Sequence, residues 1–295
     1  MNSAHLFLID PQNDFCDLPS QLIPEGQNPA LPVPGAHQDM LRLASFIRAA
    51  GPSGIDHGIT VTLDSHAVVA IERTTFWITG HGSDVEPYTE VTAAMVRSGQ
   101  IVPRVKRLTD KVLSVLTRLE ARGKVLRVWP VHCGTGTWGH NIHPAVASAL
   151  SDYEAQAYAS PTASFPAPAL QARPPVHKAL KGTYQFSEHY GVFEAEVPDH
   201  AHPETQFNYP LARRVTDGVD LLIVAGEASS HCVSASVLQL LSALDGMEHR
   251  PRILLLSDCM SPVPGFDREQ EQLFERVAEA GRCHIVTAEQ ALKYL

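Results

Sequence analysis

The sequence predicts an α/β protein, a three-layer α/β/α sandwich around a mainly parallel, Rossmann-like sheet. Short apolar runs alternate along the chain with segments in which apolar residues recur at helical spacing. Several of these runs end at a charged or polar residue. Because strands separated by helices form right-handed βαβ units, the alternation indicates parallel strands with helices on both faces of one sheet.

The elements are expected in a regular order along the chain. Strands are expected at 5–10, 58–66, 124–130, 220–226, 252–259 and 283–287. Helices are expected at 40–51, 112–123, 233–244 and 268–281. The first helix is expected to stop at Gly51-Pro52, because proline disrupts the interior of a helix.

A single domain is expected over residues 1–295, with two insertions. Residues 82–110 and 194–217 are polar, contain prolines and do not follow the strand–helix alternation. We expect them to lie over the functional edge of the sheet or at a subunit interface. Residues 159–175 are rich in proline and alanine and are expected to form an extended surface connection.

The overall charge and the cysteine pattern exclude several classes of function. The net charge of -9 and the lack of a basic run argue against a nucleic-acid partner. Five scattered cysteines without a CxxC pair suit free thiols in a reducing compartment. No apolar stretch approaches the length of a membrane span, and the first apolar run meets Asp10 too early for a signal peptide. We therefore expect a cytoplasmic protein that does not act at a membrane.

Candidate functional residues gather where strands are expected to end. In parallel sheets, binding and catalytic residues collect beyond the carboxyl ends of the strands. Six residues lie at or just after such ends: Asp10, Asp64, His66, Trp129, His132 and Cys232. One functional site at this edge of the sheet is therefore expected.

Cys232 follows a cluster of small residues, GEASSH at 226–231, and starts a predicted helix. Free backbone N–H groups and the positive end of the helix dipole favour a thiolate at such a position. A reactive cysteine and a half-buried structural cysteine are both compatible with this stretch alone.

Asp10 ends the first strand and opens the loop PQNDF. A partly desolvated carboxylate has a raised proton affinity and can act as a general base. The alternative is a residue that caps the following turn, since Asp and Asn both favour turns.

Asp64 and His66 stand two residues apart, which places both side chains on one face of a strand. This is a natural geometry for two metal ligands, although a hydrogen-bonded surface pair also fits. His132 would complete three ligands with open positions, the mark of a catalytic metal site. A structural zinc site from Cys133, His140 and His143 is the other reading of the histidine-rich stretch.

Lys181 precedes the flexible Gly182 and could reach a site at the strand ends. An ammonium there would hold a thiolate and a carboxylate together. A solvated surface lysine is the plainer interpretation, and Lys178 is the fallback should Lys181 point away.

Five motifs appear in a characteristic order: DPQNDF at 10–15, DSH at 64–66, WPxHCxxGTxG at 129–139, Lys181-Gly182 with YxxF at 190–193, and GxAxxxC at 226–232. As a set they resemble the isochorismatase-like cysteine hydrolases, and within them the nicotinamidases. The resemblance covers the sheet from residue 5 to about 290 but not the two insertions.

The resemblance implies the isochorismatase-like hydrolase fold and a site with assigned roles. Asp10, Lys181 and Cys232 would be the catalytic trio, and Asp64, His66 and His132 the ligands of one divalent metal, zinc first, with manganese and iron as alternatives. The Glu227–Ala228 peptide bond would be cis, with the N–H groups of Ala228 and Cys232 forming an oxyanion hole. Phe15, Trp129 and Tyr190 would pack around the substrate, a nicotinamide-like amide hydrolysed to the acid and ammonia through a thioester. The family also suggests a homo-oligomer.

The chain departs from the compact members of this family in the long segment between His66 and Trp129. Glu72 or His81 could supply a further metal ligand from it, and His200 and His202 could line the site from the second insertion. One rival function is a metal-independent hydrolase of N-carbamoyl or ureido compounds. A non-catalytic ligand-binding member is another, and no GxGxxG follows the first strand to support a dinucleotide-binding enzyme.

Overall fold

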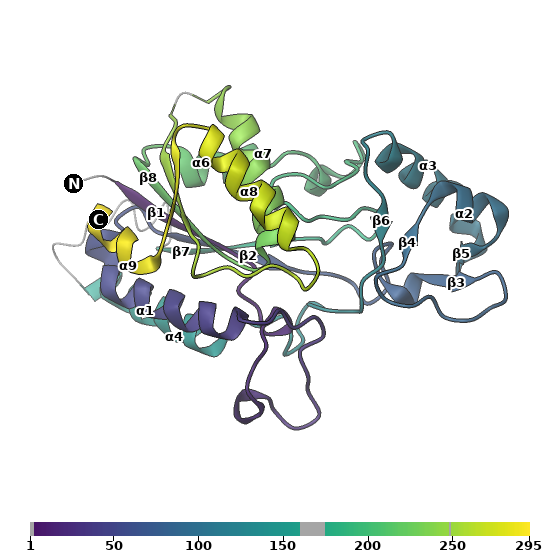
Figure 1. Cartoon of the computed structure of the whole chain (residues 1–295), viewed down its shortest axis with the longest axis horizontal. Coiled ribbons are helices and arrows are strands. Elements are labelled where there is room, and N and C mark those ends of the chain that lie inside the picture. Colours follow the sequence, from purple (N-terminus) through teal and green to yellow (C-terminus); the bar gives the residue numbers. More distant parts are fainter. Residues whose placement is uncertain (1–2, 160–174, 248) are drawn as a thin grey trace.

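The computed structural model describes residues 3–159, 175–247 and 249–295 (Figure 1). A sheet of six strands lies at its centre, in the order β10-β9-β8-β1-β2-β7, and each neighbouring pair is parallel. The strands are β1 (Ala4–Ile9), β2 (Ile59–Asp64), β7 (Val176–Lys181), β8 (Leu221–Gly226), β9 (Arg252–Leu256) and β10 (Cys283–Val286). Most of the predicted connection at 159–175 lies outside the described residues.

Helices cover both faces of this sheet (Figure 1). One face carries α1 (Ala36–Gly54), α4 (Pro144–Ala159) and α9 (Ala288–Ala291), and the other carries α6 (Tyr209–Thr216), α7 (Ser234–Leu244) and α8 (Asp267–Glu279). Successive residues of β1 serve the two layers in turn: Leu6 and Leu8 join one apolar core, Phe7 and Ile9 the other. A strand buried on both faces has no polar alternation. The predicted three-layer α/β/α fold is confirmed.

A lobe with its own apolar core extends from one end of the sheet (Figure 1, right). It contains β3 (Trp77–Thr79), β4 (Glu90–Val91), α2 (Ala93–Ser98), β5 (Ile101–Pro103), α3 (Thr109–Glu120) and β6 (Leu126–Arg127). Its two small antiparallel pairs are β3 with β5 and β4 with β6. The side chains of Trp77, Ile101 and Leu116 are buried together in its core. The lobe includes the predicted insertion at 82–110 and extends beyond it on both sides.

Two sequence expectations are wrong because a buried face does not reveal its partner. The helix expected at 112–123 exists as α3, but it packs within the lobe rather than on the sheet. The strand expected at 124–130 shortens to β6, which pairs with β4 and not with the main sheet. In the second expected insertion, 194–217, the helix α6 packs in the same apolar core as Phe7 and Ile9.

Other differences follow from position in the fold. β7 escapes the sequence patterns because it is an edge strand whose residues alternate between partly buried and exposed. Helix α4 was not expected, and α1 continues past a kink at Gly51, where φ is 55°. Short helical turns occur at Asn13–Phe15, Ser20–Leu22, Thr74–Phe76, Lys106–Leu108, Pro203–Thr205, Ser229–Val233 and Leu292–Tyr294. No helix in the described part of the chain has both the length and the apolar character needed to cross a membrane.

Candidate active site

Three side chains from three neighbouring strands meet at the carboxyl edge of the sheet. The ammonium of Lys181, at the end of β7, lies 3.0 Å from Oδ2 of Asp10, which follows β1. The same Nζ lies 2.6 Å from Oδ1 of Asp64, at the end of β2, and 3.6 Å from the thiol of Cys232. All four residues are buried. Lys181 therefore joins the nucleophile candidate to two carboxylates.

The local backbone brings these side chains close. Asp10 adopts a left-handed conformation with φ of 45°, which turns the chain sharply at the end of β1. On the adjacent strand, Gly226 has φ of 125°, and a Cβ there would lie 1.9 Å from the carbonyl oxygen of Ile9. Only glycine permits this approach of β8 to β1, so a larger residue at position 226 would push the Cys232 loop away from Asp10.

Cys232 lies in a widened helical turn, Ser229–Val233, directly before α7. The carbonyl of Ala228 accepts hydrogen bonds from the N–H groups of His231 and Val233. The peptide bond between Glu227 and Ala228 is cis. Ala228 and Cys232 both line the same small pocket.

Burial has a larger effect on the pKa of the Cys232 thiol than any neighbouring charge. Burial raises the pKa of Cys232 well above its ordinary value, while Lys181 lowers it and the nearby Asp10 and Asp64 carboxylates raise it. Burial thus opposes the thiolate that the start of the helix was expected to favour. Burial also raises the pKa of Asp10, partly offset by Lys181. A carboxylate with raised proton affinity beside a neutral thiol has the arrangement of a general base and its nucleophile.

A small aromatic pocket opens onto the thiol. Its volume is about 30 Å³, and its walls include all three aromatic residues expected from the sequence, Phe15, Trp129 and Tyr190. The indole N–H of Trp129 donates to the hydroxyl of Tyr190 at 2.9 Å, which fixes both rings. This volume holds about two water molecules, so a ring-sized ligand requires side chains of the wall to move.

Glu188, Tyr190 and His231 form part of this wall and also line a second cavity of about 350 Å³. That cavity lies between the lobe and the helices α7 and α8, and residues such as Leu126 and Leu238 line it. His231 packs against Tyr190 and Phe266, with ring centroids 5.4 and 4.7 Å apart. These three shared residues separate the nucleophile from the larger space.

Asp64, His66 and His132 approach one another on the other side of Lys181. Nε2 of His66 lies 2.7 Å from Oδ1 of Asp64, and Nε2 of His132 lies 3.4 Å from its Oδ2. Burial alone would lower the pKa of His66, but Asp64 raises it to about 9. Glu72 faces His66 from the opposite side, with Oε1 2.8 Å from Nδ1. Glu72 is thus placed to orient His66, rather than beside the Nε2 that faces Asp64.

The chemistry of these three side chains suits a divalent metal, but their arrangement does not. Among residues 3–159, 175–247 and 249–295, no group of His, Cys, Asp and Glu side chains is arranged to hold a metal ion. The guanidinium of Arg73 lies among the expected ligands, with Nη1 3.0 Å from Nε2 of His132 and Nη2 3.8 Å from Oδ2 of Asp64. The position expected for the metal therefore adjoins a permanent cation.

The alternative candidates from the sequence lie elsewhere. Lys178, His81 and His200 are all exposed. His202 packs on the ring of Tyr184, at 4.3 Å between centroids. The three residues of the alternative zinc site do not converge: His143 pairs with His37, His140 with Ser65, and Cys133 is buried by itself in the apolar core.

Sequence reasoning missed Arg73 and Glu188. Glu72 and Arg73 follow directly after the apolar run AVVAI at 67–71, and a charged pair at the end of such a run was the available signal. Glu188 lies in the pocket wall, where its Oε1 accepts the N–H of His189 and its Oε2 has no hydrogen-bond partner among the described residues. Burial raises the pKa of Glu188 to about 7. No periodic pattern marks this residue.

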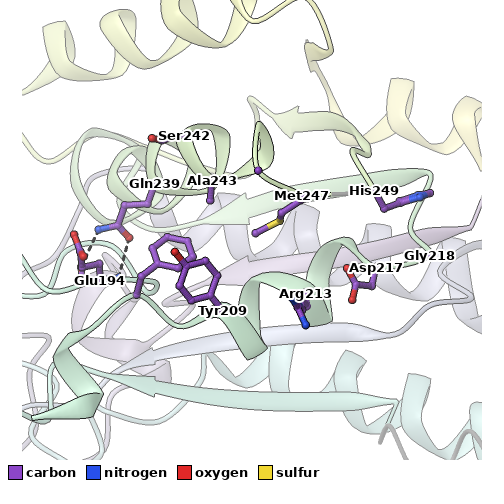
Figure 2. A pocket seen from close by; sticks show the side chains of 12 residues that line it. Glu194, Tyr209, Arg213, Asp217, Gly218, Gln239, Ser242, Ala243, Met247 and His249 are labelled. Carbon is purple, nitrogen blue, oxygen red and sulfur yellow. Dashed lines mark hydrogen bonds between the residues drawn. The ribbon is translucent and has the colours of Figure 1, made fainter.

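A larger groove lies away from these residues. Figure 2 shows it beside α6 and α7, with a volume of about 990 Å³ and walls that include Tyr209, Arg213 and Met247. The side-chain amide of Gln239 bridges to the backbone of Glu194 at one end of it. None of the residues expected at the site lines this groove, so its size does not make it the reactive centre.

No family model matches the chain, and no curated protein matches it. Among solved structures, the yeast nicotinamidase shares 18% identity over 96% of this chain and 99% of its own, with a TM-score of 0.59. A nicotinamidase and pyrazinamidase of Acinetobacter baumanii shares 16% identity over 99% of both chains, with a TM-score of 0.58. The yeast enzyme bound to the inhibitor nicotinaldehyde shares 19% identity over 96% of this chain and 99% of its own, with a TM-score of 0.58. The expected resemblance to nicotinamidases is thus confirmed in the fold.

Proposed function

We propose that the chain is a cysteine amidohydrolase that converts nicotinamide, or a similar heteroaromatic amide, to the acid and ammonia. The observation that carries this proposal is the buried ammonium of Lys181, within 3.6 Å of both the Asp10 carboxylate and the Cys232 thiol. A nucleophile beside a base, with a cation to balance both, is the arrangement that acyl transfer requires.

The first step is attack on the amide carbon. Asp10 removes the thiol proton of Cys232 and becomes neutral, and Lys181 stabilises the resulting thiolate by direct contact. The thiolate then adds to the carbonyl carbon, and the oxygen becomes negative. The N–H groups of Ala228 and Cys232 are the proposed donors to that oxygen.

The second step releases ammonia and then the acid. Asp10 returns the proton to the amide nitrogen, the C–N bond breaks, and a thioester to Cys232 remains. Asp10, again a carboxylate, takes a proton from a water molecule that attacks the thioester. The C–S bond breaks, the acid leaves, and the Cys232 thiolate takes the proton back from Asp10.

The pocket supports a flat aromatic substrate. The aromatic side chains of Phe15, Trp129 and Tyr190 line the same pocket as Cys232, and aromatic rings pack favourably against one another. Retention of the base, cation and nucleophile in contact argues against a ligand-binding protein without turnover.

A second candidate function is hydrolysis of N-carbamoyl or ureido compounds, which would use the same trio without a metal. The contact of Arg73 with His132 favours it, because the divalent metal that the nicotinamidase resemblance implies would need His132 as a ligand. Both candidates release ammonia, so one assay covers them.

The test is ammonia release from nicotinamide, pyrazinamide and a panel of N-carbamoyl amides by the wild type and Cys232→Ala. Turnover of the heteroaromatic amides that disappears in the variant is the expected result. Release from the carbamoyl compounds alone would keep the trio and replace the substrate. Absence of release from every amide, by a folded wild type, would overturn the proposed activity.

A further inference from the structure

Arg73 is buried where a charged side chain requires strong compensation. The residue is 1% exposed and lies in the segment between β2 and the lobe, where its backbone bridges to Trp129. An arginine keeps its charge at every pH at which proteins fold. A buried guanidinium therefore persists only where opposite charges or acceptors face it.

The groups that face Arg73 are those expected to bind metal, or adjoin them. Its Nη1 lies 2.7 Å from Nδ1 and 3.0 Å from Nε2 of His132, its Nη2 3.8 Å from Oδ2 of Asp64, and its Nε 3.5 Å from Oε1 of Glu72. Glu72 in turn faces Nδ1 of His66. One guanidinium thus contacts two expected ligands and the carboxylate that faces the third.

His132 shows why the two cations compete. Nη1 of Arg73 lies within hydrogen-bond distance of both ring nitrogens of His132, and the carbonyl oxygen of Pro130 lies 2.9 Å from Nδ1. A metal ion would need the lone pair of one of these nitrogens, and the guanidinium already lies beside both. A divalent ion at the same nitrogen would also repel the guanidinium across a few ångströms of buried, weakly screening protein.

We propose that the guanidinium of Arg73 is the resident cation of the Asp64–His66–His132 cluster and takes the place of a divalent metal there. The two expected ligands that line the pocket, Asp64 and His132, are then held by an arginine behind them. This inference rests on the contacts of Arg73 and not on the proposed amidase activity. Metal binding can therefore be measured whether or not any amide is hydrolysed.

The experiment is a titration of the chelator-treated, full-length protein with Zn²⁺ in a calorimeter, for the wild type and His132→Ala. A parallel titration with Co²⁺ is followed by visible absorption, which reports direct coordination by nitrogen and oxygen. We expect the wild type to bind no equivalent of Zn²⁺ or Co²⁺ that is lost in His132→Ala. In Arg73→Met, which keeps the length of the side chain without its charge, we expect one equivalent to appear. That equivalent should vanish again in Arg73→Met combined with His132→Ala.

The matched control is Arg97→Met, which removes an exposed arginine of α2 and should behave as the wild type. One equivalent of Zn²⁺ in the wild type that is lost in His132→Ala would overturn the proposal. A folded Arg73→Met that binds no additional equivalent of metal would overturn the proposal as well. The guanidinium would then not be what takes the place of a metal at the cluster. Should Arg73→Met fail to fold, the comparison of the wild type with His132→Ala still shows whether a metal ion binds at His132.

Discussion

The two sides of Lys181 solve the same problem of buried charge in different ways. On the nucleophile side, Asp10 and Cys232 contact the lysine directly. On the histidine side, the guanidinium of Arg73 faces Asp64 and Glu72 at 3.5 to 3.8 Å, and its Nε and Nη2 have no hydrogen-bond partner among the described residues. The first side is ready for proton transfer between neighbours, whereas on the second side the guanidinium lies near its two carboxylates without a hydrogen bond to either. The difference indicates that residues on the nucleophile side carry out the reaction and that residues on the histidine side hold other side chains in position.

Removal of Lys181 should have the largest effect, because it serves both sides. In Lys181→Met, Asp10 and Asp64 lose their shared counter-ion inside the protein. We expect a loss of about 3–5 kcal/mol in the free energy of unfolding, measured by urea denaturation, together with loss of any amide turnover. Lys178→Met, on the same strand but exposed, is the matched control and should change neither quantity measurably. Equal stability of the two variants would show that the lysine does not balance the two sides.

A substitution on the histidine side should lower the free energy of unfolding clearly but should lower kcat only modestly. Glu72→Gln removes the carboxylate that faces His66 and Arg73, both buried. We expect about 1–3 kcal/mol of destabilisation, because two buried cationic groups lose part of their compensation. Glu72 does not line the pocket, so kcat should fall by less than tenfold. Loss of activity as complete as in Lys181→Met would place the histidine side in the chemistry after all.

The acid limb of the pH–rate profile should report Asp10 on the nucleophile side. The hydroxyl of Thr62 donates to Oδ1 of Asp10 at 2.6 Å and helps to lower its pKa. In Thr62→Val that pKa rises further, and because the base must be ionised, activity is lost at a higher pH as the solution is acidified. We expect a shift of about one pH unit in the acid limb. Thr60→Val, on the same face of β2 but hydrogen-bonded to His5, should leave the limb in place.

The last prediction concerns Glu227, which lies outside both sides and should affect stability but not the reaction. Burial and the nearby Asp39 raise the pKa of Glu227 well above its ordinary value. Its folded pKa lies above the unfolded one, so its contribution is complete below about pH 4.5 and is lost as pH rises toward the folded pKa. This loss amounts to at most about 1.4 kcal/mol per pH unit. Glu227→Gln should match the wild type in thermal stability near pH 4 and exceed it at pH 8.

Much of the site could be predicted because short-range patterns report strand ends. Apolar runs that stop at Asp10, Asp64 and Gly226 indicate strands, and parallel strands bring such ends to one edge. The lobe could not be predicted in full. Its helix α3 carries an amphipathic pattern that any apolar partner would satisfy, whether the main sheet or the core around Trp77. Edge strand β7 lacked the buried pattern that reveals central strands.

By itself, the amino-acid sequence determined the three-layer α/β class, the carboxyl-edge location of the site and the candidate residues Asp10, Asp64 and Cys232, because periodicity and strand-end chemistry are properties of neighbours along the chain. Only the tertiary structure decided that Lys181 contacts all three, that burial keeps the thiol protonated and that Arg73 enters the histidine cluster. These features depend on distances between segments far apart in the chain, and on the loss of water around charges. Neither property can be predicted from a short stretch of the sequence.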